Sequence, residues 1–187
     1  MINKLTEEFI EIFDENNNPT GIIKEKKKAH QDGDYHRAVH VWIINNKNEI
    51  LLQRRSEKKE NNPNCLDTSC AGHIMAGETI LQGAIRELKE ELNVDACENE
   101  FIYITTIRRS KKTQNKEFWY IYLLKCNKTI EEYIFNDKEV SEVKYINYKK
   151  LEEMVNEKVD VLLLNGEHEE EYRKLFEFIK KNVIKTI

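Results

Sequence analysis

The sequence is poor in the residues that build disulfide frameworks and flexible linkers. Its 187 residues include 4 cysteines, 2 prolines and 6 glycines. The cysteines form no Cys-x-x-Cys pair and no dense pattern, so we expect free thiols in a reducing compartment. A zinc site built from Cys65, Cys70 and His73 lacks an evident fourth ligand. No internal repeat or linker divides the chain, so we predict a single domain over residues 1–187.

Long apolar runs and an excess of basic residues are also missing. No stretch is apolar enough to cross a bilayer, and no positively charged leader followed by an apolar stretch opens the sequence. The formal net charge of -4 argues against a nucleic-acid binder, which would carry a basic stripe. We therefore expect a cytoplasmic protein that binds neither membranes nor nucleic acid.

The most informative stretch runs from residue 72 to residue 94. Thr79 is a good helix N-cap, and Gln82 three residues later completes a capping box. Asn93 tolerates the left-handed conformation that closes a helix. The signals for the start and for the end of a helix therefore predict one helix over about residues 80–92.

This predicted helix divides into two faces. Apolar residues fall on one stripe, which we expect to face the core: Leu81, Ala84, Ile85, Leu88 and Leu92. Glu87, Glu90 and Glu91 stand at i, i+3 and i+4, so their like charges repel unless a cation lies among them. A cluster of carboxylates suits Mg²⁺ or Mn²⁺. For an isolated Glu-x-x-Glu-Glu pattern, a solvated acidic face is the commoner explanation.

The surrounding residues change that balance. Gly72, five residues, Glu78, seven residues and then the run 86–94 (Arg-Glu-Leu-Lys-Glu-Glu-Leu-Asn-Val) closely resemble the signature of the Nudix hydrolases. That signature is Gly-x5-Glu-x7-Arg-Glu-U-x-Glu-Glu-x-Gly-U, where U is a bulky aliphatic residue. Only Asn93 departs from it, at a position where the family has glycine.

The resemblance implies a fold, an activity and a set of site residues. The fold is α/β, a Nudix-type α/β/α sandwich with a mixed sheet. The activity is divalent-metal-dependent hydrolysis, with Mg²⁺ or Mn²⁺, of a diphosphate linkage in a nucleoside diphosphate joined to a group X, or in a related small molecule. In the family the acidic helix face binds the metal, a backbone carbonyl adds a ligand, and a Glu and an Arg brace the loop. The corresponding residues here are Glu87, Glu90, Glu91 and Gly72 for the metal, and Glu78 and Arg86 for the brace, with Glu87 also a candidate general base.

Two further groups could take part. Arg54 and Arg55 end a predicted strand, and a guanidinium grips phosphate oxygens bidentately, but alternation lets only one of the two face the site. Glu139 and Glu142 are candidates for the base outside the signature, although both read more simply as surface residues. Specificity for X is expected in the loops 57–64 and 108–116.

The remaining elements follow from periodicity and turn residues. The predicted elements are a hairpin over 9–23, strands at 37–44, 50–53, 101–107, 118–124 and 140–146, an extended segment at 66–74, and helices at 148–156 and about 167–183. Residues 24–28 are predicted to form a run of charged residues exposed to solvent, and residues 30–35 a polar connection.

A second resemblance is to type I isopentenyl diphosphate isomerase, itself a Nudix-fold enzyme. His36 and His73 match two of its metal histidines. The expected catalytic cysteine immediately before the Gly-His pair is Ala71 here, and Cys70 lies one place off, which in a strand means the other face. His30 is also one residue closer to His36 than the isomerase pattern requires, and of its later glutamate pair this chain keeps one, Glu117.

We therefore prefer the hydrolase and keep two alternatives, an isomerase-like enzyme and a Nudix-fold protein that binds a nucleotide without catalysis. Non-catalytic members usually lose carboxylates of the signature, whereas this chain keeps all four. The sequence leaves open the identity of X, the general base, the oligomeric state, and whether His36 and His73 bind a metal.

Overall fold

The protein is built around one long buried strand, β3 (Tyr35–Ile44). The computed structural model describes residues 8–59, 61–109, 115–135, 139–164 and 166–183. On one side β3 pairs in parallel with β8 (Lys116–Lys125), whose other neighbour is β7 (Phe101–Arg109). On its other side β3 meets three antiparallel partners in turn: β1 (Phe9–Phe13), β6 (Cys70–His73) and β4 (Glu49–Arg55).

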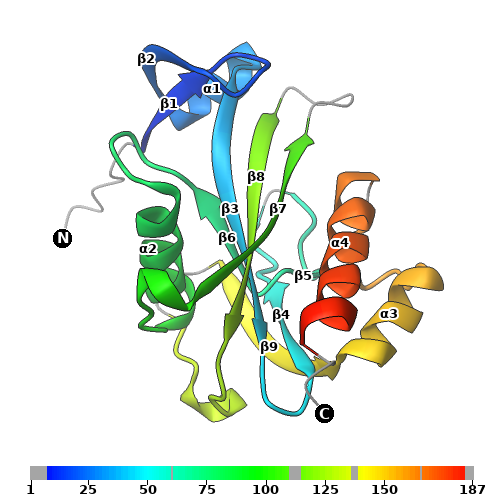
Figure 1. Cartoon of the computed structure of the whole chain (residues 1–187). Coiled ribbons are helices and arrows are strands. Elements are labelled where there is room, and N and C mark those ends of the chain that lie inside the picture. Colours follow the sequence, from blue (N-terminus) through cyan, green and yellow to red (C-terminus); the bar gives the residue numbers. More distant parts are fainter. Residues whose placement is uncertain (1–7, 60, 110–114, 136–138, 165, 184–187) are drawn as a thin grey trace.

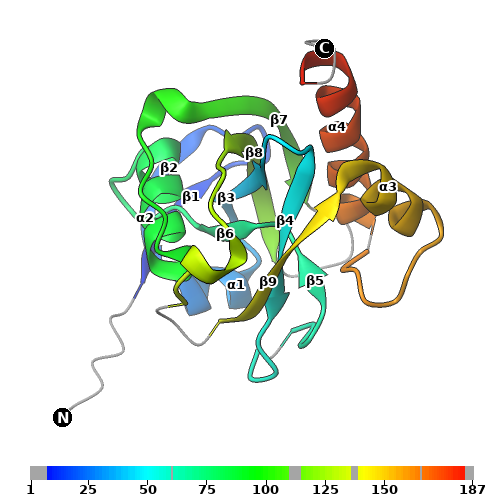
Figure 2. The same ribbon diagram turned by 90° about the horizontal axis from the view of Figure 1, so that it is seen from below.

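Three further strands complete a nine-stranded mixed sheet. They are β2 (Pro19–Glu25) beside β1, and β9 (Val140–Asn147) and β5 (Leu66–Asp67) beside β4. A parallel pair such as β3–β8 requires cover on both faces of the sheet. Helices supply it, as Figures 1 and 2 show, and the α/β/α sandwich with a mixed sheet is confirmed.

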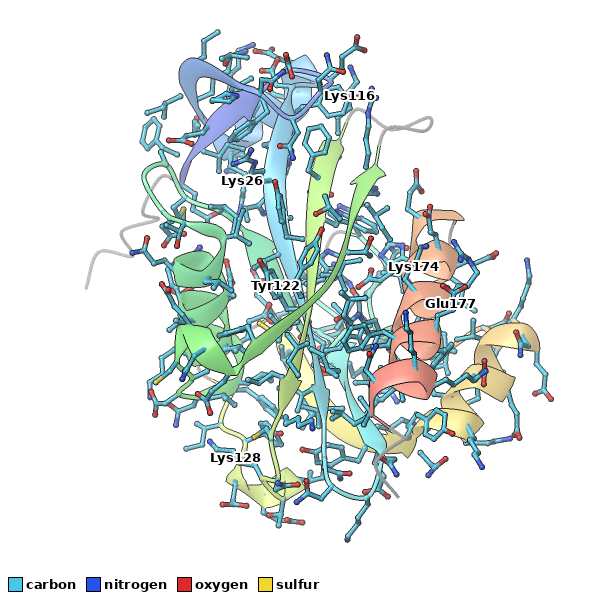
Figure 3. All side chains as sticks on the ribbon, in the orientation of Figure 1. Lys26, Lys116, Tyr122, Lys128, Lys174 and Glu177 are labelled. Carbon is cyan, nitrogen blue, oxygen red and sulfur yellow. The ribbon has the colours of Figure 1, made fainter. Side chains whose placement is uncertain are left out.

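Each face of the sheet has its own apolar core. Val39, Val41 and Ile43 of β3 point to the side covered by α2 (Ile80–Leu92), where Leu88 and Leu92 pack. The alternate residues of β3 point to the opposite side, covered by α3 (Tyr148–Asn156) and α4 (Gly166–Asn182). Side chains fill the space between the sheet and these helices (Figure 3). The buried residues of α4 are Tyr172, Leu175, Phe176 and Ile179, which follow helical spacing, together with His168 and Glu171.

The predicted ends of α2 are confirmed. The Thr79 hydroxyl oxygen accepts a hydrogen bond from the Gln82 N–H, and Gln82 Oε1 accepts one from the Thr79 N–H at 2.9 Å. Asn93 closes the helix in the left-handed conformation, with φ of 51°. The buried face of α2 differs from the predicted apolar stripe. Leu81 and Ile85 are only partly buried, whereas Glu91 is buried.

The polar connection predicted for residues 30–35 was wrong, because Lys26–Asp32 form a helix, α1. Lys27 and Lys28 of the charge run are exposed, as predicted, but they belong to this helix. Ala29 is fully buried against β1, Lys28 pairs with Asp32 one turn away, and Gly33 closes the helix at φ of 69°. The signal was the i,i+4 ion pair followed by a glycine, and the run of lysines obscured it. Two short 3₁₀ turns, Glu98–Glu100 and Ile130–Glu132, were also not predicted.

Among the described residues, no helix is long and apolar enough to span a membrane.

Candidate active site

A cavity of about 820 Å³ wraps around β6. Strand β6 is only four residues long and pairs with β3 alone among the described strands, so side chains of α2 can bond to its other edge. Because β6 lies between α2 on one face of the sheet and α4 on the other, the cavity receives side chains from both layers. Acidic and basic groups dominate its lining.

Arg86 organises the α2 side of the cavity. All five of its N–H donors have acceptors: Nε and Nη2 bind the two oxygens of Glu78 at 2.8 and 3.0 Å, Nη2 also binds the His73 carbonyl at 2.8 Å, and Nη1 binds Glu87 at 2.7 Å and Glu90 at 3.1 Å. Glu78 also accepts a hydrogen bond from the Met75 N–H. These contacts tie the loop 73–78 to the helix, the placement that the signature implied for Glu78 and Arg86.

The three signature carboxylates occupy different environments. The Glu90 side chain is 54% exposed and that of Glu87 is 13% exposed. Glu91 is buried, and its Oε2 lies 3.3 Å from the Ala71 N–H, which donates to it. Glu87 and Glu90 belong to the described lining of the cavity and Glu91 does not. The cation that separates Glu87 from Glu90 here is therefore the guanidinium of Arg86.

Burial raises the pKa of the Glu87 carboxyl to about 7, although Arg86 opposes the shift. The negative charges of Glu90 and Glu139 raise it further. A carboxylate that is buried near other carboxylates is costly to ionise, so a divalent cation beside it would stabilise its charged form. The described residues therefore fit a cation at Glu87 and Glu90, and the metal roles of Glu87, Glu90, Glu91 and the Gly72 carbonyl all stay predictions.

The two arginines at the end of β4 point in opposite directions. Arg55 lines the cavity and donates from Nη1 to Asp67 at 3.1 Å. Arg54 instead donates to Glu142 at 2.6 Å and to the Asn64 carbonyl. Strand alternation therefore selects Arg55 as the residue that can meet a phosphate there, and its role in binding stays a prediction.

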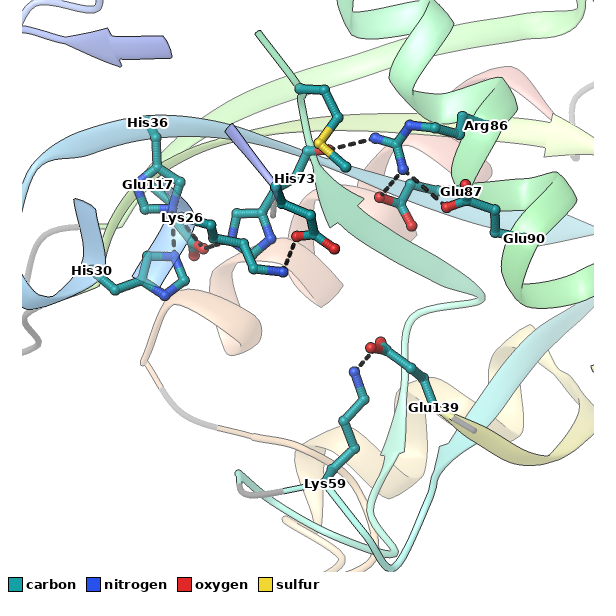
Figure 4. A network of polar contacts seen from close by, with 12 residues as sticks. Lys26, His30, His36, Lys59, His73, Arg86, Glu87, Glu90, Glu117 and Glu139 are labelled. Carbon is teal, nitrogen blue, oxygen red and sulfur yellow. Dashed lines mark hydrogen bonds and ion pairs between the residues drawn. The ribbon is translucent and has the colours of Figure 1, made fainter. Parts of the chain in front are cut away.

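Glu139 and Glu142, like the two arginines, differ in whether they line the cavity. Glu139 lines the cavity and forms an ion pair with Lys59 beside it (Figure 4). Glu142, which pairs with Arg54, is outside the described lining. Of the two candidates for a base outside the signature, only Glu139 is placed where it could act.

A second cluster, which we call the histidine cluster, consists of His30, His36, His73 and Glu117. One ligand atom from each lies within 4.8 Å of the others. His30 Nε2 and His36 Nε2 are 3.2 Å apart, and Glu117 Oε1 lies 3.4 Å from His36 Nε2 and 3.1 Å from His73 Nε2. Figure 4 shows this cluster and the carboxylates of α2 around one opening.

Sheet register explains why residues so distant in sequence meet. His36 of β3 pairs with Glu117 of β8, and Ala38 pairs with His73 of β6, so these side chains share one face. Helix α1 then supplies His30. His30 is one residue closer to His36 than the isomerase pattern requires. Helix α1, which was not predicted, nevertheless places it beside His36.

The protonation pattern of the histidine cluster suits a transition metal. Burial and the neighbouring histidines lower the pKa of His30 to about 4, and burial lowers that of His73 despite Glu117. His36 Nδ1 lies 3.1 Å from the Asp34 carbonyl, to which it can donate, and its Nε2 faces His30 and Glu117. Burial opposes ionisation of Glu117, but hydrogen bonds with His36 and His73 hold its pKa well below the usual value. Neutral imidazoles with one carboxylate form a metal-binding donor set.

The model of the NUDIX domain matches residues 34–164. The chain belongs to the Nudix family. Nudix hydrolase 3 of Arabidopsis thaliana is 38% identical over 95% of this chain, although the chain spans only 24% of that protein. Isopentenyl-diphosphate Delta-isomerase 2 of Photorhabdus laumondii is 31% identical, over 83% of this chain and 86% of its own length. The family and these relatives support the assignment as a Nudix hydrolase with isomerase-like relatives.

The Nudix fold is also supported by solved structures. The crystal structure of DR0079 from Deinococcus radiodurans superposes with a TM-score of 0.70, covering 89% of this chain and 98% of that one. The two sequences are 24% identical, so this likeness concerns the fold alone.

Proposed function

We propose that this Nudix protein hydrolyses a diphosphate linkage in a nucleoside diphosphate derivative or a related diphosphate compound, with Mg²⁺ or Mn²⁺. The observation that carries the proposal is the position of Glu87. Its carboxylate lies against the backbone of Gly72, lines the cavity with Glu90, and has a pKa of about 7 because it is buried.

Glu87 and Glu90 would hold the cation, together with Glu91 and the Gly72 carbonyl if the predicted ligand set is complete. A bound divalent ion makes a water molecule more acidic and draws charge from phosphate oxygens. Arg86 fixes Glu87 and Glu90 relative to the loop through the hydrogen bonds described above. The carboxylates are thus held in place before the ion and the substrate bind, which favours catalysis by positioning.

The opening of the cavity carries residues suited to a diphosphate. Arg55 donates from Nη1 to Asp67 and from Nε and Nη2 to the Asn61 carbonyl, so only the second N–H of each terminal nitrogen is left for phosphate oxygens. Lys59 also lines the cavity and forms an ion pair with Glu139. A diphosphate that draws Lys59 away would leave Glu139 able to accept a proton from the attacking water, and Glu87 is the alternative base.

An isomerase is the second candidate, favoured by the histidine cluster and by the Photorhabdus relative. The histidines and Glu117 fit a transition metal as described. Cys70, however, is fully buried in the core on the α2 side, among Val39, Val41 and Leu88. The residue that faces the cavity before the Gly-His pair is Ala71, which has no proton to transfer. We therefore prefer hydrolysis and assign the histidine cluster to a second cation.

A binding-only protein is the third candidate. It is disfavoured because Glu78, Glu87, Glu90 and Arg86 are all present and linked in one hydrogen-bond network.

A screen of diphosphate compounds tests the proposal. The full chain would be incubated with Mg²⁺ or Mn²⁺ and with nucleoside triphosphates, diphosphate sugars, dinucleoside polyphosphates and isopentenyl diphosphate, and the products would be identified by mass spectrometry. We expect metal-dependent release of a phosphate or of a nucleoside monophosphate, abolished by chelation. Formation of dimethylallyl diphosphate would establish the isomerase instead. Absence of turnover with every compound would favour the protein that binds without catalysis.

A further inference from the structure

A buried ion pair joins β3 to α4 in the lining of the cavity. His40 of β3 is 6% exposed and Glu171 of α4 is 1% exposed. His40 Nδ1 lies 3.1 Å from Oε1 and 2.9 Å from Oε2 of Glu171, and Oε1 also accepts a hydrogen bond from Trp42 Nε1 at 2.8 Å. His40 lines the cavity, yet the hydrolysis proposed above gives it no task.

The contacts of the His40 ring leave one nitrogen for a ligand. Because Nδ1 faces a carboxylate, which accepts hydrogen bonds, Nδ1 carries a hydrogen and donates it to Glu171. Trp119 stacks on the ring at a centroid distance of 4.5 Å. Within the described part of the chain Nε2 has no hydrogen-bond partner, and the ring lines the cavity, so Nε2 is the nitrogen that a ligand meets.

Small neighbours keep the space beside His40 open. Ala38 lies two residues away on β3, and Ala71 of β6 is the cross-strand partner of His40, so the three side chains point to one face of the sheet. Both alanines line the cavity. Trp42, two residues away in the other direction, packs against Tyr172 instead, with 5.1 Å between ring centroids. The open side of His40 is therefore the side of the two alanines.

His40 and the carboxylates of α2 lie on opposite faces of the sheet around β6. Gly72 faces Glu87 on the α2 side, whereas Ala71 and its partner His40 point to the α4 side. The cavity reaches both sides. In an in-line displacement, the attacking water and the leaving oxygen lie on opposite sides of the phosphorus. A diphosphate attacked by a water beside Glu87 would therefore direct its leaving phosphate toward His40.

The charged and titratable groups around His40 favour a proton on its ring. Burial would lower the pKa of His40, but Glu171 of α4, Asp67 of β5 and Glu117 of β8 outweigh burial and raise the pKa above its usual value. His168, which interacts with His40 from α4, adds no positive charge near neutral pH, because burial lowers its own pKa. The environment thus favours the imidazolium, which has a hydrogen on each nitrogen.

We propose that His40, oriented by Glu171, is the general acid of the hydrolysis and donates the Nε2 proton to the bridging oxygen of the leaving phosphate. The oxygen of the attacking water forms a new bond to phosphorus, and its proton passes to the carboxylate base discussed above. The bridging P–O bond breaks, its electron pair stays on the leaving oxygen, and that oxygen takes the proton from Nε2. His40 then regains a proton from solvent. This inference rests on the hydrolase function proposed above.

Glu171 is a positioning residue in this scheme, because it touches His40 and not the substrate. Its carboxylate fixes the tautomer of the ring and stabilises the charge that the ring carries before Nε2 donates. Trp42 Nε1 holds Glu171 in turn. Removal of either member of the pair should therefore change how turnover depends on pH, which a purely structural role would not do.

The kinetic test measures kcat from acidic to alkaline pH with the best substrate of the screen. His40→Asn keeps an N–H toward Glu171 and removes Nε2, so we expect kcat to fall by about a hundredfold. The wild type should lose activity at alkaline pH as His40 loses its proton, and His40→Asn should lack this decline. Glu171→Gln keeps the imidazole without the carboxylate, so the decline should move to lower pH.

Glu177→Gln is the matched control, because it makes the same substitution on the exposed side of α4 (Figure 3). It should leave kcat and its pH dependence unchanged. Normal kcat in His40→Asn would overturn the inference while the hydrolase proposal stands. A fall in kcat that is equal at every pH, with the alkaline decline retained, would also overturn it.

Nuclear magnetic resonance gives a second measurement that needs neither turnover nor a variant. Methylenediphosphonate, in which a carbon replaces the bridging oxygen, would be added with Mg²⁺ to protein labelled with ¹⁵N in its 5 histidines. We expect the Nε2 resonance of His40 to shift and the ring to keep its proton to higher pH. An unchanged His40 resonance would overturn the inference, whether or not the compound binds elsewhere. If the wild type cleaves nothing, the hydrolase proposal fails, while this experiment still decides whether His40 meets a diphosphate.

Discussion

The carboxyl carbon of Glu87 lies 2.0 Å from the position that a Cβ atom would occupy on residue 72. Glycine is therefore required at this position by close packing, since both oxygens of Glu87 also fall within 2.5 Å of that position. Strand β6 and helix α2 approach one another here because residue 72 has no side chain. The family signature thus joins a glycine and a glutamate that are in direct contact.

Gly72→Ala should displace the Glu87 carboxylate and reduce turnover by at least about a hundredfold, because a misplaced metal ligand loses the positioning on which catalysis depends. Gly166→Ala is the matched control, since a Cβ there meets nothing within 4 Å among the described residues. Turnover with a diphosphate substrate would be measured for both variants, together with their circular dichroism spectra. Normal turnover in folded Gly72→Ala would show that the position of Glu87 is unimportant.

The carboxylates of α2 can be tested by neutral substitutions. Glu87→Gln and Glu90→Gln preserve shape and remove one charge each, so we expect turnover to fall by about two orders of magnitude or more in each. Glu91→Gln should have a similar effect if Glu91 also binds the metal, and it tests that prediction separately, because Glu91 lies outside the described lining of the cavity. The measurement is kcat at saturating Mg²⁺.

Glu177→Gln serves again as the control, because Glu177 is exposed and pairs only with Arg173 in the described structure. Its turnover should equal that of the wild type. Full activity in both Glu87→Gln and Glu90→Gln would remove the basis of the hydrolase proposal.

Two cation sites predict two separable thermal shifts. A ligand that binds only the folded state at about 100 times its Kd adds about 2.7 kcal/mol, which corresponds to roughly 5–10 °C in a domain of this size. We expect Glu87→Gln to lose most of the shift caused by Mg²⁺, and His73→Gln to lose most of the shift caused by Zn²⁺. Differential scanning fluorimetry of the metal-stripped protein measures both. Identical responses of the two variants to the two ions would argue against separate sites.

The brace between Glu78 and Arg86 predicts a dependence of stability on pH. Burial would raise the pKa of Glu78, but hydrogen bonds from Arg86 and the Met75 N–H lower it below its usual value. A carboxyl with a lower pKa in the folded state stabilises the protein above the unfolded pKa of about 4.3, and this contribution is lost as the pH falls through the folded pKa.

Glu78→Gln should therefore lower the free energy of unfolding at pH 7 by on the order of 1 kcal/mol, a value reduced because the pair is partly exposed. The difference between wild type and variant should shrink as the pH falls below the usual pKa of a glutamate and through the lower pKa of Glu78 in the folded state. Urea unfolding at several pH values measures it, and a difference that is constant with pH would contradict the ionic role of Glu78.

Local patterns in the sequence were enough to place most of the elements. The capping box of Thr79 and Gln82, the left-handed Asn93 and the apolar period of α4 are properties of neighbouring residues, and each was confirmed. Helix α1 was missed because its seven residues bury one side chain, Ala29, so periodicity gave almost no signal.

The orientation of Glu91 could not be read from helical spacing alone. It shares an arc with Glu87 and Glu90, but β6 packs so close to α2 that Glu91 turns toward the Ala71 N–H. The histidine cluster is a similar case, because its members come from α1, β3, β6 and β8, and only the register between strands brings them together.

By itself, the sequence determined the family and the helix that carries the carboxylates. These depend on residues close together in the chain, whose spacing already fixes their relative positions. The tertiary structure alone decided that Arg55 and not Arg54 faces the cavity, that the histidines converge on Glu117, and that α4 closes one wall with His168. These depend on sheet register and on packing between distant segments, which no local pattern encodes.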